Sequence, residues 1–191
     1  MTNLAVFASG TGTNFDAIAD AIECGDLKAN LVLVVCDKPN AKVIEKAKNR
    51  GIEVFAFNPK DYASKAEYET DILKELQARN VDFIALAGYM RLLSTTLLDV
   101  YEGRCVNIHP ALLPAFTGKD AIHQAVSYGV KVIGVTIHYV DSGMDSGKII
   151  AQRAFDIEDG WDEDEIESRI HKIEHVLYKE TLMKLLNKEN N

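Results

Sequence analysis

Short apolar runs alternate with amphipathic stretches along the first 130 residues of the chain. The runs have the length of strands and are apolar on both faces, which is typical of parallel strands buried between helices. They cover residues 4–8, 31–36, 54–57, 83–87 and 105–108. Helical periodicity predicts helices near residues 14–24, 40–50, 65–79, 94–101 and 119–128. This order predicts an α/β fold with a mostly parallel, twisted sheet and helices on both of its faces.

The pattern changes after residue 130. Two strand-like runs, Val132 to Val140 and Lys148 to Phe155, are separated by the Gly- and Asp-rich sequence DSGMDSG, which suits a hairpin or a longer functional loop. We therefore expect an antiparallel edge on the C-terminal side of the sheet. From Trp161 onward one helical stripe predicts a long helix packed on the sheet, and it contains Ile166, Ile170, Ile173 and Leu177.

The start of this last helix is dense in carboxylates, in the sequence DIEDGWDEDEIE. A metal or a basic partner could use such a cluster. Capping of the helix by Asp162, together with a favourable interaction of acidic groups with the helix dipole, explains the same residues without a ligand. We expect the capping role.

Composition and charge narrow the class of protein. The chain has 191 residues, of which 47% are hydrophobic and 26% charged, so we expect one globular domain over residues 1–191. A net charge of −8 argues against non-specific binding to nucleic acid. The N-terminus has no basic region typical of a signal peptide, and no apolar span reaches 18 residues, so we expect no membrane association and a cytoplasmic location.

The three cysteines, Cys24, Cys36 and Cys105, lie in or next to apolar stretches without metal-binding spacing. Their odd number and surroundings predict buried free thiols in a reducing compartment.

The first strand is followed by a turn of small residues, Ser9 to Asn14, that leads directly into a helix. Backbone N–H groups at such a helix start bind anions, and a single phosphate group is the preferred ligand. A dinucleotide is the main alternative, because Gly10 and Gly12 begin a GxGxxG pattern and Asp37 follows the second strand. Phe15 stands where the third glycine would be, which argues against it. A turn without a ligand is the third possibility.

Asn107 and His109 are two positions apart on an expected strand, so their side chains project from the same face. Pro110 follows and places the pair at the carboxyl end of the strand, where ligands of open α/β sheets bind. An amide can hold a developing oxyanion and an imidazole can move a proton, which suits transfer of a carbonyl group. Asp145 is the first candidate for a carboxylate partner of the imidazole, and Asp141 is the second.

The same residue types have other roles in proteins. Asn107 and His109 could simply satisfy backbone groups at a strand end. A zinc site is disfavoured, because His171 and His175 are four residues apart with Glu174 between them but no third ligand is evident. No GxSxG motif is present and the cysteines lie within apolar runs, which disfavours covalent catalysis. Direct attack of one substrate on another fits better.

Five motifs together resemble the phosphoribosylglycinamide formyltransferase family: FASGTGTNF, ALAGYMRLLS, NIHPALLPAFTG, GVTIHYVDSGMDSGKII and IHKIEHVLY. The resemblance runs from about residue 2 to residue 186. The NIHP and LLP elements are also similar to methionyl-tRNA formyltransferase and formyltetrahydrofolate deformylase. Those relatives carry a further domain at one end, and we expect none in a chain of this length.

The resemblance implies transfer of the formyl group of 10-formyltetrahydrofolate to the amine of 5-phosphoribosylglycinamide in purine synthesis, without a metal. It implies that Asn107 holds the carbonyl oxygen, that His109 acts as general acid, and that Asp145 favours the protonated form of His109. Hydrolysis of the formyl-folate on the same core and a catalytically silent binding module remain alternatives. The implied partners are small molecules, and we expect a monomer or weak homodimer.

The resemblance also implies two substrate sites. The ribonucleotide site consists of Gly12, Thr13, Asn14, Phe15, Asp16 and Glu174. The folate site consists of Lys65, Met90, Arg91, Leu92, Leu93, Asn107 and Asp141. Three positions depart from some family members: Lys65 replaces Arg, the sequence PAFTG lacks a basic residue before its aromatic residue, and Lys179 replaces Pro.

Overall fold

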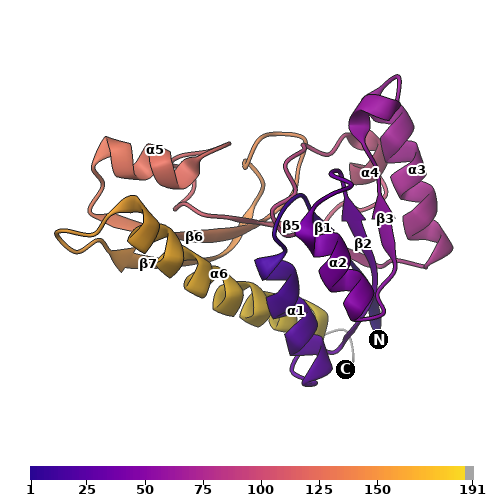
Figure 1. Ribbon diagram of the computed structural model, residues 1–191, viewed down its shortest axis with the longest axis horizontal. Coiled ribbons are helices and arrows are strands. Elements are labelled where there is room, and N and C mark those ends of the chain that lie inside the picture. Colours follow the sequence, from indigo (N-terminus) through magenta and orange to yellow (C-terminus); the bar gives the residue numbers. More distant parts are fainter. Residues whose placement is uncertain (188–191) are drawn as a thin grey trace.

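A computed structural model describes residues 1–187 of the chain. Within these residues one seven-stranded sheet has the strand order β3-β2-β1-β4-β5-β6-β7 (Figure 1). The strands are β1 (Thr2–Ala8), β2 (Ala29–Cys36), β3 (Val54–Ala56), β4 (Phe83–Leu86), β5 (Cys105–His109), β6 (Val132–Tyr139) and β7 (Ile149–Asp156). Strands β1 to β5 are parallel to one another, β6 pairs antiparallel with β5, and β7 pairs antiparallel with β6. The predicted fold class and its antiparallel C-terminal edge are confirmed.

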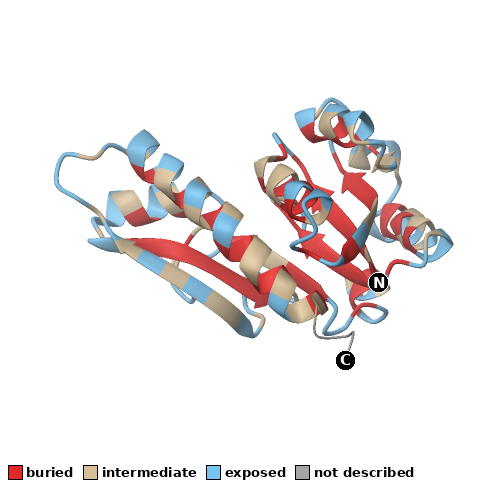
Figure 2. Ribbon diagram, turned by 90° about the horizontal axis from the view of Figure 1, so that it is seen from below, coloured by how far each residue is buried: buried red, intermediate tan, exposed pale blue. Residues whose placement is uncertain are grey.

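Helices cover both faces of the sheet, as predicted. They are α1 (Thr13–Glu23), α2 (Lys42–Asn49), α3 (Lys65–Ala78), α4 (Thr95–Leu98), α5 (Ala121–Tyr128) and α6 (Glu163–Leu186), and a short 3-10 helix, η1 (Pro59–Asp61), was not predicted. Side chains of α1, α2, α5 and α6 share one apolar core, whereas α3 and α4 belong to a second core on the opposite face. The buried strands between these helices are visible in Figure 2.

Strand β1 shows why an uninterrupted apolar run is needed here. Leu4, Val6 and Ala8 lie in the core on one face, and Ala5 and Phe7 lie in the core on the other. Side chains alternate between the faces of a strand, so a strand covered on both sides must be apolar at every position.

Helix α6 begins as its sequence predicts. The carboxylate of Asp162 accepts a hydrogen bond of 2.8 Å from the backbone N–H of Glu165, which confirms the capping role. Ile166, Ile170 and Leu177 are buried against the sheet, and Ile173 is partly buried at the edge of the same stripe.

Tyr178 of α6 ties this helix to the middle of the sheet. Its side chain is completely buried, and its hydroxyl donates to the carbonyl oxygen of Leu86 at 2.8 Å and also lies 3.3 Å from that of Val106. These carbonyls belong to β4 and β5, so one phenol fixes two neighbouring strands immediately beside Asn107.

The topology reverses between β1 and β4. The chain leaves β1 toward β2 on one side, and it leaves β4 toward β5 on the other. Such a reversal opens a crevice at the carboxyl ends of the strands, which is where open α/β sheets bind ligands. The segments that follow β1, β4 and β5 therefore meet at one edge.

All three cysteines are free. Cys36 and Cys105 are buried as predicted, but Cys24 is exposed, so the prediction is wrong for this residue. Cys24 caps the C-terminal end of α1, beyond the turns of that helix that pack on the sheet. Between residues 1 and 187, none of the helices combines the length and the apolar character needed to cross a bilayer.

Candidate active site

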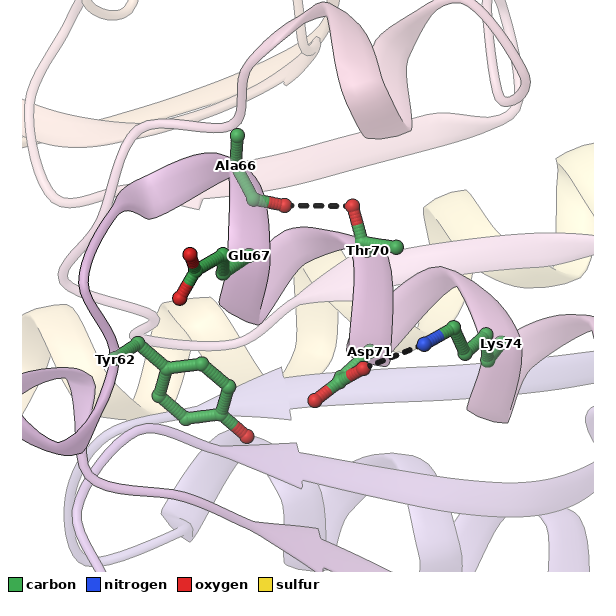
Figure 3. A pocket seen from close by; sticks show the side chains of 6 residues that line it. All are labelled: Tyr62, Ala66, Glu67, Thr70, Asp71 and Lys74. Carbon is green, nitrogen blue, oxygen red and sulfur yellow. Dashed lines mark hydrogen bonds and ion pairs between the residues drawn. The ribbon is translucent and has the colours of Figure 1, made fainter.

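A cleft of about 920 Å³ runs along the carboxyl edge of the sheet. Its walls come from the segments that follow β1, β4 and β5, from the loop between β6 and β7, and from α6. Most of the predicted site residues line it. A shallower hollow of about 380 Å³ lies on α3 (Figure 3) and contains none of them.

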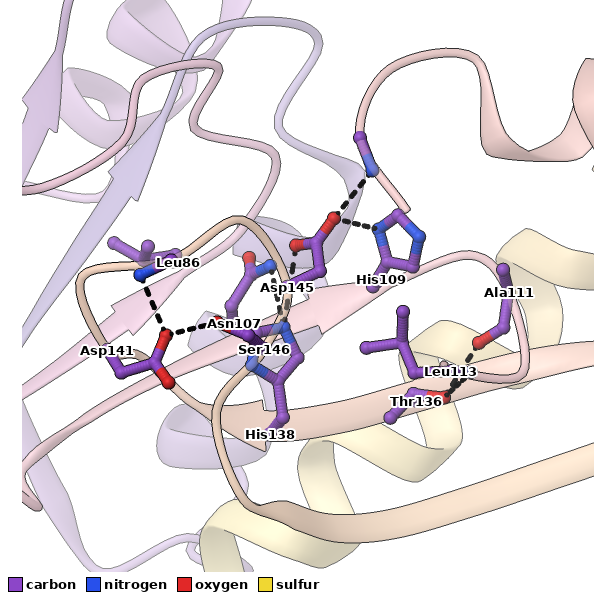
Figure 4. Close-up of polar contacts among 12 residues, drawn as sticks. Leu86, Asn107, His109, Ala111, Leu113, Thr136, His138, Asp141, Asp145 and Ser146 are labelled. Atoms are coloured by element: carbon purple, nitrogen blue, oxygen red, sulfur yellow. Dashed lines mark hydrogen bonds and ion pairs between the residues drawn. The ribbon is translucent and has the colours of Figure 1, made fainter. Parts of the chain in front are cut away.

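Strand β5 presents Asn107 and His109 on one face, as predicted from their spacing, while Val106 and Ile108 point into the core on the other. In the antiparallel pair of β5 and β6, Asn107 lies opposite His138. The Nδ2 atom of Asn107 is 3.3 Å from Nε2 of His138 (Figure 4). The amide is therefore held by a neighbouring imidazole.

His109 is buried and has an acceptor at each ring nitrogen. Its Nε2 atom lies 2.8 Å from the carbonyl oxygen of Phe116, and its Nδ1 atom lies 3.4 Å from Oδ2 of Asp145. A carbonyl oxygen can only accept, so Nε2 carries a hydrogen. The Asp145 carboxylate lies beside Nδ1, so each ring nitrogen has a neighbouring oxygen that can accept a hydrogen bond.

Asp145 reaches this position because the loop between β6 and β7 folds back over the sheet (Figure 4). Its backbone has a φ of 53°, a left-handed conformation that Asp tolerates better than most residues. Its Oδ2 atom accepts a hydrogen bond of 2.8 Å from the N–H of Gly118, and its Oδ1 atom lies 3.6 Å from Nε2 of His138.

The ionisation of Asp145 reflects opposing effects. Burial alone would raise its pKa, but the contacts with His138, with the Gly118 N–H and with His109 outweigh burial and lower the pKa below its usual value. The carboxylate is therefore charged at neutral pH.

The structure thus brings Asn107, His109 and Asp145 together. Asp141, the second candidate, lies at the start of the same loop and accepts from the Gly143 N–H at 3.0 Å and from the Ser146 hydroxyl at 2.8 Å. Its carboxylate shapes the loop and still lines the cleft.

His138, which contacts both Asn107 and Asp145, was not predicted as a site residue. The predicted antiparallel edge implies that some residue of the neighbouring strand lies directly opposite Asn107. Without the register, however, His138 could not be chosen over the adjacent residues.

The first loop has the geometry of an anion site. Gly12 has a φ of 76°, and a Cβ atom there would lie 2.8 Å from Cγ2 of Val43, so only glycine fits. Helix α1 begins at Thr13 without a side-chain cap, and its first N–H groups have no acceptor within the helix. This loop lines one end of the cleft.

Asn14 and Glu174 meet at the same end. Both are buried, and the Nδ2 atom of Asn14 lies 3.4 Å from Oε2 of Glu174. The same carboxylate oxygen is 2.8 Å from Nδ1 of His171, whose pKa it raises through this hydrogen bond. The Oδ1 atom of Asn14 is buried and has no hydrogen-bond partner among residues 1–187.

Two residues assigned to the ribonucleotide site do not line the cleft. Phe15 is fully buried in the core beneath α1. Asp16 binds Lys46 at 2.5 Å and lies 3.6 Å from Arg50. Both residues anchor α1, and the helical period turns them away from the cleft that Thr13 and Asn14 face.

The predicted folate segment follows β4. Met90, Arg91, Leu92 and Leu93 all line the cleft, and Met90 and Leu92 are exposed apolar side chains at its mouth. The structure does not bring Lys65 to the cleft. Its Nζ atom lies 3.8 Å from Glu69 one turn along α3.

The structure does not support a dinucleotide site or a metal site at the carboxyl edge of the sheet. Asp37 is occupied by Ser9 and Arg91, so its carboxylate is not available to a ribose of a dinucleotide. Across the 187 described residues, no group of three or more His, Cys, Asp and Glu side chains could hold a metal ion. His175 is instead a half-buried imidazole whose pKa is lowered by burial.

The α/β sheet and a cleft that combines an amide, an imidazole and a carboxylate indicate an enzyme that acts on a carbonyl group. The chain belongs to the formyl transferase family, whose sequence pattern matches residues 2–182. It is 52% identical over 190 residues to the phosphoribosylglycinamide formyltransferase of Bacillus subtilis (strain 168), covering 100% of this chain and 97% of that protein.

Solved structures agree. Glycinamide ribonucleotide transformylase 1 from Geobacillus kaustophilus has a TM-score of 0.95 and 59% identity, covering 97% of this chain and 99% of that one. Phosphoribosylglycinamide formyltransferase from Bacillus halodurans has a TM-score of 0.97 and 51% identity, covering 100% and 98%. The resemblance inferred from the motifs is confirmed.

A second arrangement occurs among the relatives. The trifunctional purine biosynthetic protein adenosine-3 of Drosophila melanogaster is 41% identical over 186 residues, which are 96% of this chain and 14% of that protein. The same unit thus occurs both as a separate chain and within a multifunctional enzyme.

Proposed function

We propose that this enzyme transfers the formyl group of 10-formyltetrahydrofolate to the amine of 5-phosphoribosylglycinamide, a step of purine synthesis. One observation carries the proposal: His109, Asp145 and Asn107 lie in one cleft between two binding segments. One segment is the first loop, residues 9–14, which we call the phosphate-type loop, and the other is the folate segment, residues 90–93. The names of the relatives described above agree with this reaction and do not favour the hydrolase alternative.

The reaction needs a group that donates a hydrogen bond to the oxyanion and a group that transfers protons. The amine attacks the formyl carbon, and the new C–N bond converts the carbonyl into a tetrahedral oxyanion. The Nδ2 group of Asn107 donates to this oxygen, in an orientation favoured by its contact with His138. The His109 imidazolium stabilises the negative charge as general acid.

Proton transfer completes the step. The attacking nitrogen loses a proton, and N10 of the folate gains one as its bond to the formyl carbon breaks. Asp145 lies within 3.4 Å of His109 and stays ionised, so it maintains the imidazolium and accepts or relays the proton of the amine through water.

The ends of the cleft hold the two substrates. The turn formed by Gly12, Thr13 and Asn14 binds the phosphate, and Glu174 accepts hydrogen bonds from the ribose. At the other end, the segment from Met90 to Leu93 and the loop at Asp141 enclose the flat pterin between apolar side chains and backbone groups.

Purified enzyme given 10-formyltetrahydrofolate with and without the ribonucleotide tests the proposal. Turnover that requires the ribonucleotide supports formyl transfer. Turnover with water alone would support the hydrolase, and binding without turnover would support a silent module.

We further propose one domain over residues 1–191, of which 188–191 lie outside the described residues, and a cytoplasmic monomer or weak homodimer. The two free buried thiols suit a reducing compartment, and every group used in the mechanism comes from one chain. Sedimentation equilibrium at micromolar concentration measures the assembly. A tight oligomer would contradict this proposal.

A further inference from the structure

Asp37 lies between the two substrate-binding segments and is bound to both. It follows β2, and its Oδ1 atom accepts a hydrogen bond of 2.5 Å from the hydroxyl of Ser9, the residue that opens the phosphate-type loop. Its Oδ2 atom accepts a hydrogen bond of 2.7 Å from Nε of Arg91, in the folate segment. Both carboxylate oxygens are thus used.

Ser9 closes a second connection to the folate segment. Its hydroxyl oxygen accepts a hydrogen bond of 2.9 Å from the backbone N–H of Met90. Its own backbone N–H donates to the carbonyl oxygen of Gly88 at 3.2 Å. The start of the phosphate-type loop and the start of the folate segment are therefore joined through backbone and side chain alike.

Because this network is buried, the charge of Asp37 must be balanced by a nearby cation. Asp37 and Ser9 are each only 3% exposed, whereas the side chain of Arg91 is 39% exposed and lines the cleft. A buried carboxylate needs a compensating charge, and Arg91 is the cation that the structure places against it. The guanidinium also lies 6.0 Å from the centre of the Tyr68 ring, so its direction is fixed from two sides.

We propose that Asp37 is a positioning residue that couples the two substrate sites, through Ser9 to the phosphate-type loop and through Arg91 to the folate segment. A ligand that fixes one segment lowers the cost of fixing the other, so each substrate tightens binding of its partner by the same factor. The inference rests on the proposed function, because it requires a folate and a phosphorylated ribonucleotide in one cleft.

Calorimetry measures the coupling directly. Tetrahydrofolate, which has no formyl group to transfer, is titrated into the enzyme with and without saturating 5-phosphoribosylglycinamide. In the wild type the ribonucleotide is expected to lower the Kd of tetrahydrofolate about threefold or more, within the range of ordinary coupling energies. Asp37→Asn keeps the shape but removes the charge that holds Arg91, so the coupling factor falls toward 1 and tetrahydrofolate binds about tenfold more weakly.

Two further variants separate positioning from folding. Ser9→Ala removes the hydroxyl but keeps the ion pair of Asp37 with Arg91, so it reduces the coupling factor with a smaller loss of tetrahydrofolate affinity. Asp71→Asn breaks a carboxylate contact of 2.9 Å with Lys74 outside the cleft, and it retains the wild-type coupling. A purely structural role of Asp37 would lower the melting temperature and the fraction of active protein without changing the coupling factor.

The inference is overturned if the wild type shows no coupling, or if folded Asp37→Asn retains the wild-type coupling factor. In either case a wild type that still transfers the formyl group leaves the proposed function intact. A wild type that binds neither ligand refutes the proposed function and this inference together.

Discussion

Nδ1 of His109 lies 3.4 Å from Oδ2 of Asp145, although the first residue ends β5 and the second belongs to the loop after β6. The contact is completed by the Gly118 N–H, which donates to the same carboxylate oxygen at 2.8 Å. A charged carboxylate is therefore oriented toward the imidazole from a loop rather than from a neighbouring strand. The mechanism depends on this relationship.

Replacement of Asp145 by Asn is expected to lower kcat by about 10² to 10³, while the KM of each substrate changes by less than about threefold. The amide keeps the size of the side chain but cannot sustain the imidazolium of His109 or take the proton of the amine. Steady-state rates at several pH values measure the effect. Asp159→Asn, at a fully exposed carboxylate 3.7 Å from Lys131, is the control. A kcat close to that of the wild type across the pH range would contradict the role of Asp145.

The same carboxylate should appear in the pH dependence of stability. The pKa of Asp145 is lowered in the folded state, so its contribution is present above the unfolded value of about 3.9 and is lost as the pH falls through the folded value. The free energy of unfolding of the wild type should therefore exceed that of Asp145→Asn at pH 6, and the difference should shrink below about pH 4. Urea unfolding at each pH measures it. A difference that stays constant or grows in acid would contradict the lowered pKa.

At the other end of the cleft, Asn14→Ala is expected to raise the KM of the ribonucleotide about tenfold and that of the folate much less. The substitution removes a buried amide that lies 3.4 Å from Glu174 at the end of the cleft formed by the first loop. Thr13→Ala should act in the same direction. Equal increases for both substrates would show that the first loop does not belong to the ribonucleotide alone.

Tyr178→Phe is expected to lower the free energy of unfolding by about 1 to 3 kcal/mol. The variant keeps the ring but leaves the Leu86 carbonyl oxygen without the hydroxyl that donates to it at 2.8 Å. Denaturant unfolding measures the loss. An unchanged midpoint and slope would show that the hydroxyl does not fix the two strands.

Most of the fold could be predicted from the sequence because the buried strands carry their own signal. A run such as Leu4 to Ala8, apolar at every position, predicts a strand covered on both faces, and the structure confirms it. Cys24 shows the limit of this reasoning. The apolar neighbours of Cys24 predict that its side chain is buried, but the residue caps the C-terminal end of α1 and is exposed.

Site residues could be predicted where their spacing along one strand or helix determines the direction of their side chains. Asn107 and His109 share a face because they are two apart on a strand, and the structure places both in the cleft. His138 could not be found in this way, because its contact with Asn107 depends on the register of two strands. Lys65 was assigned through resemblance alone, and α3 keeps it away from the cleft.

The fate of the formyl carbon tests the central claim most directly. The enzyme is given 10-formyltetrahydrofolate labelled with ¹⁴C in the formyl group, together with 5-phosphoribosylglycinamide, and the products are separated. Direct transfer predicts that the label appears in the formylated ribonucleotide, in an amount equal to the tetrahydrofolate released, and that Asn107→Ala slows its appearance about a hundredfold. Label recovered as formate at the same rate with or without the ribonucleotide would contradict the account.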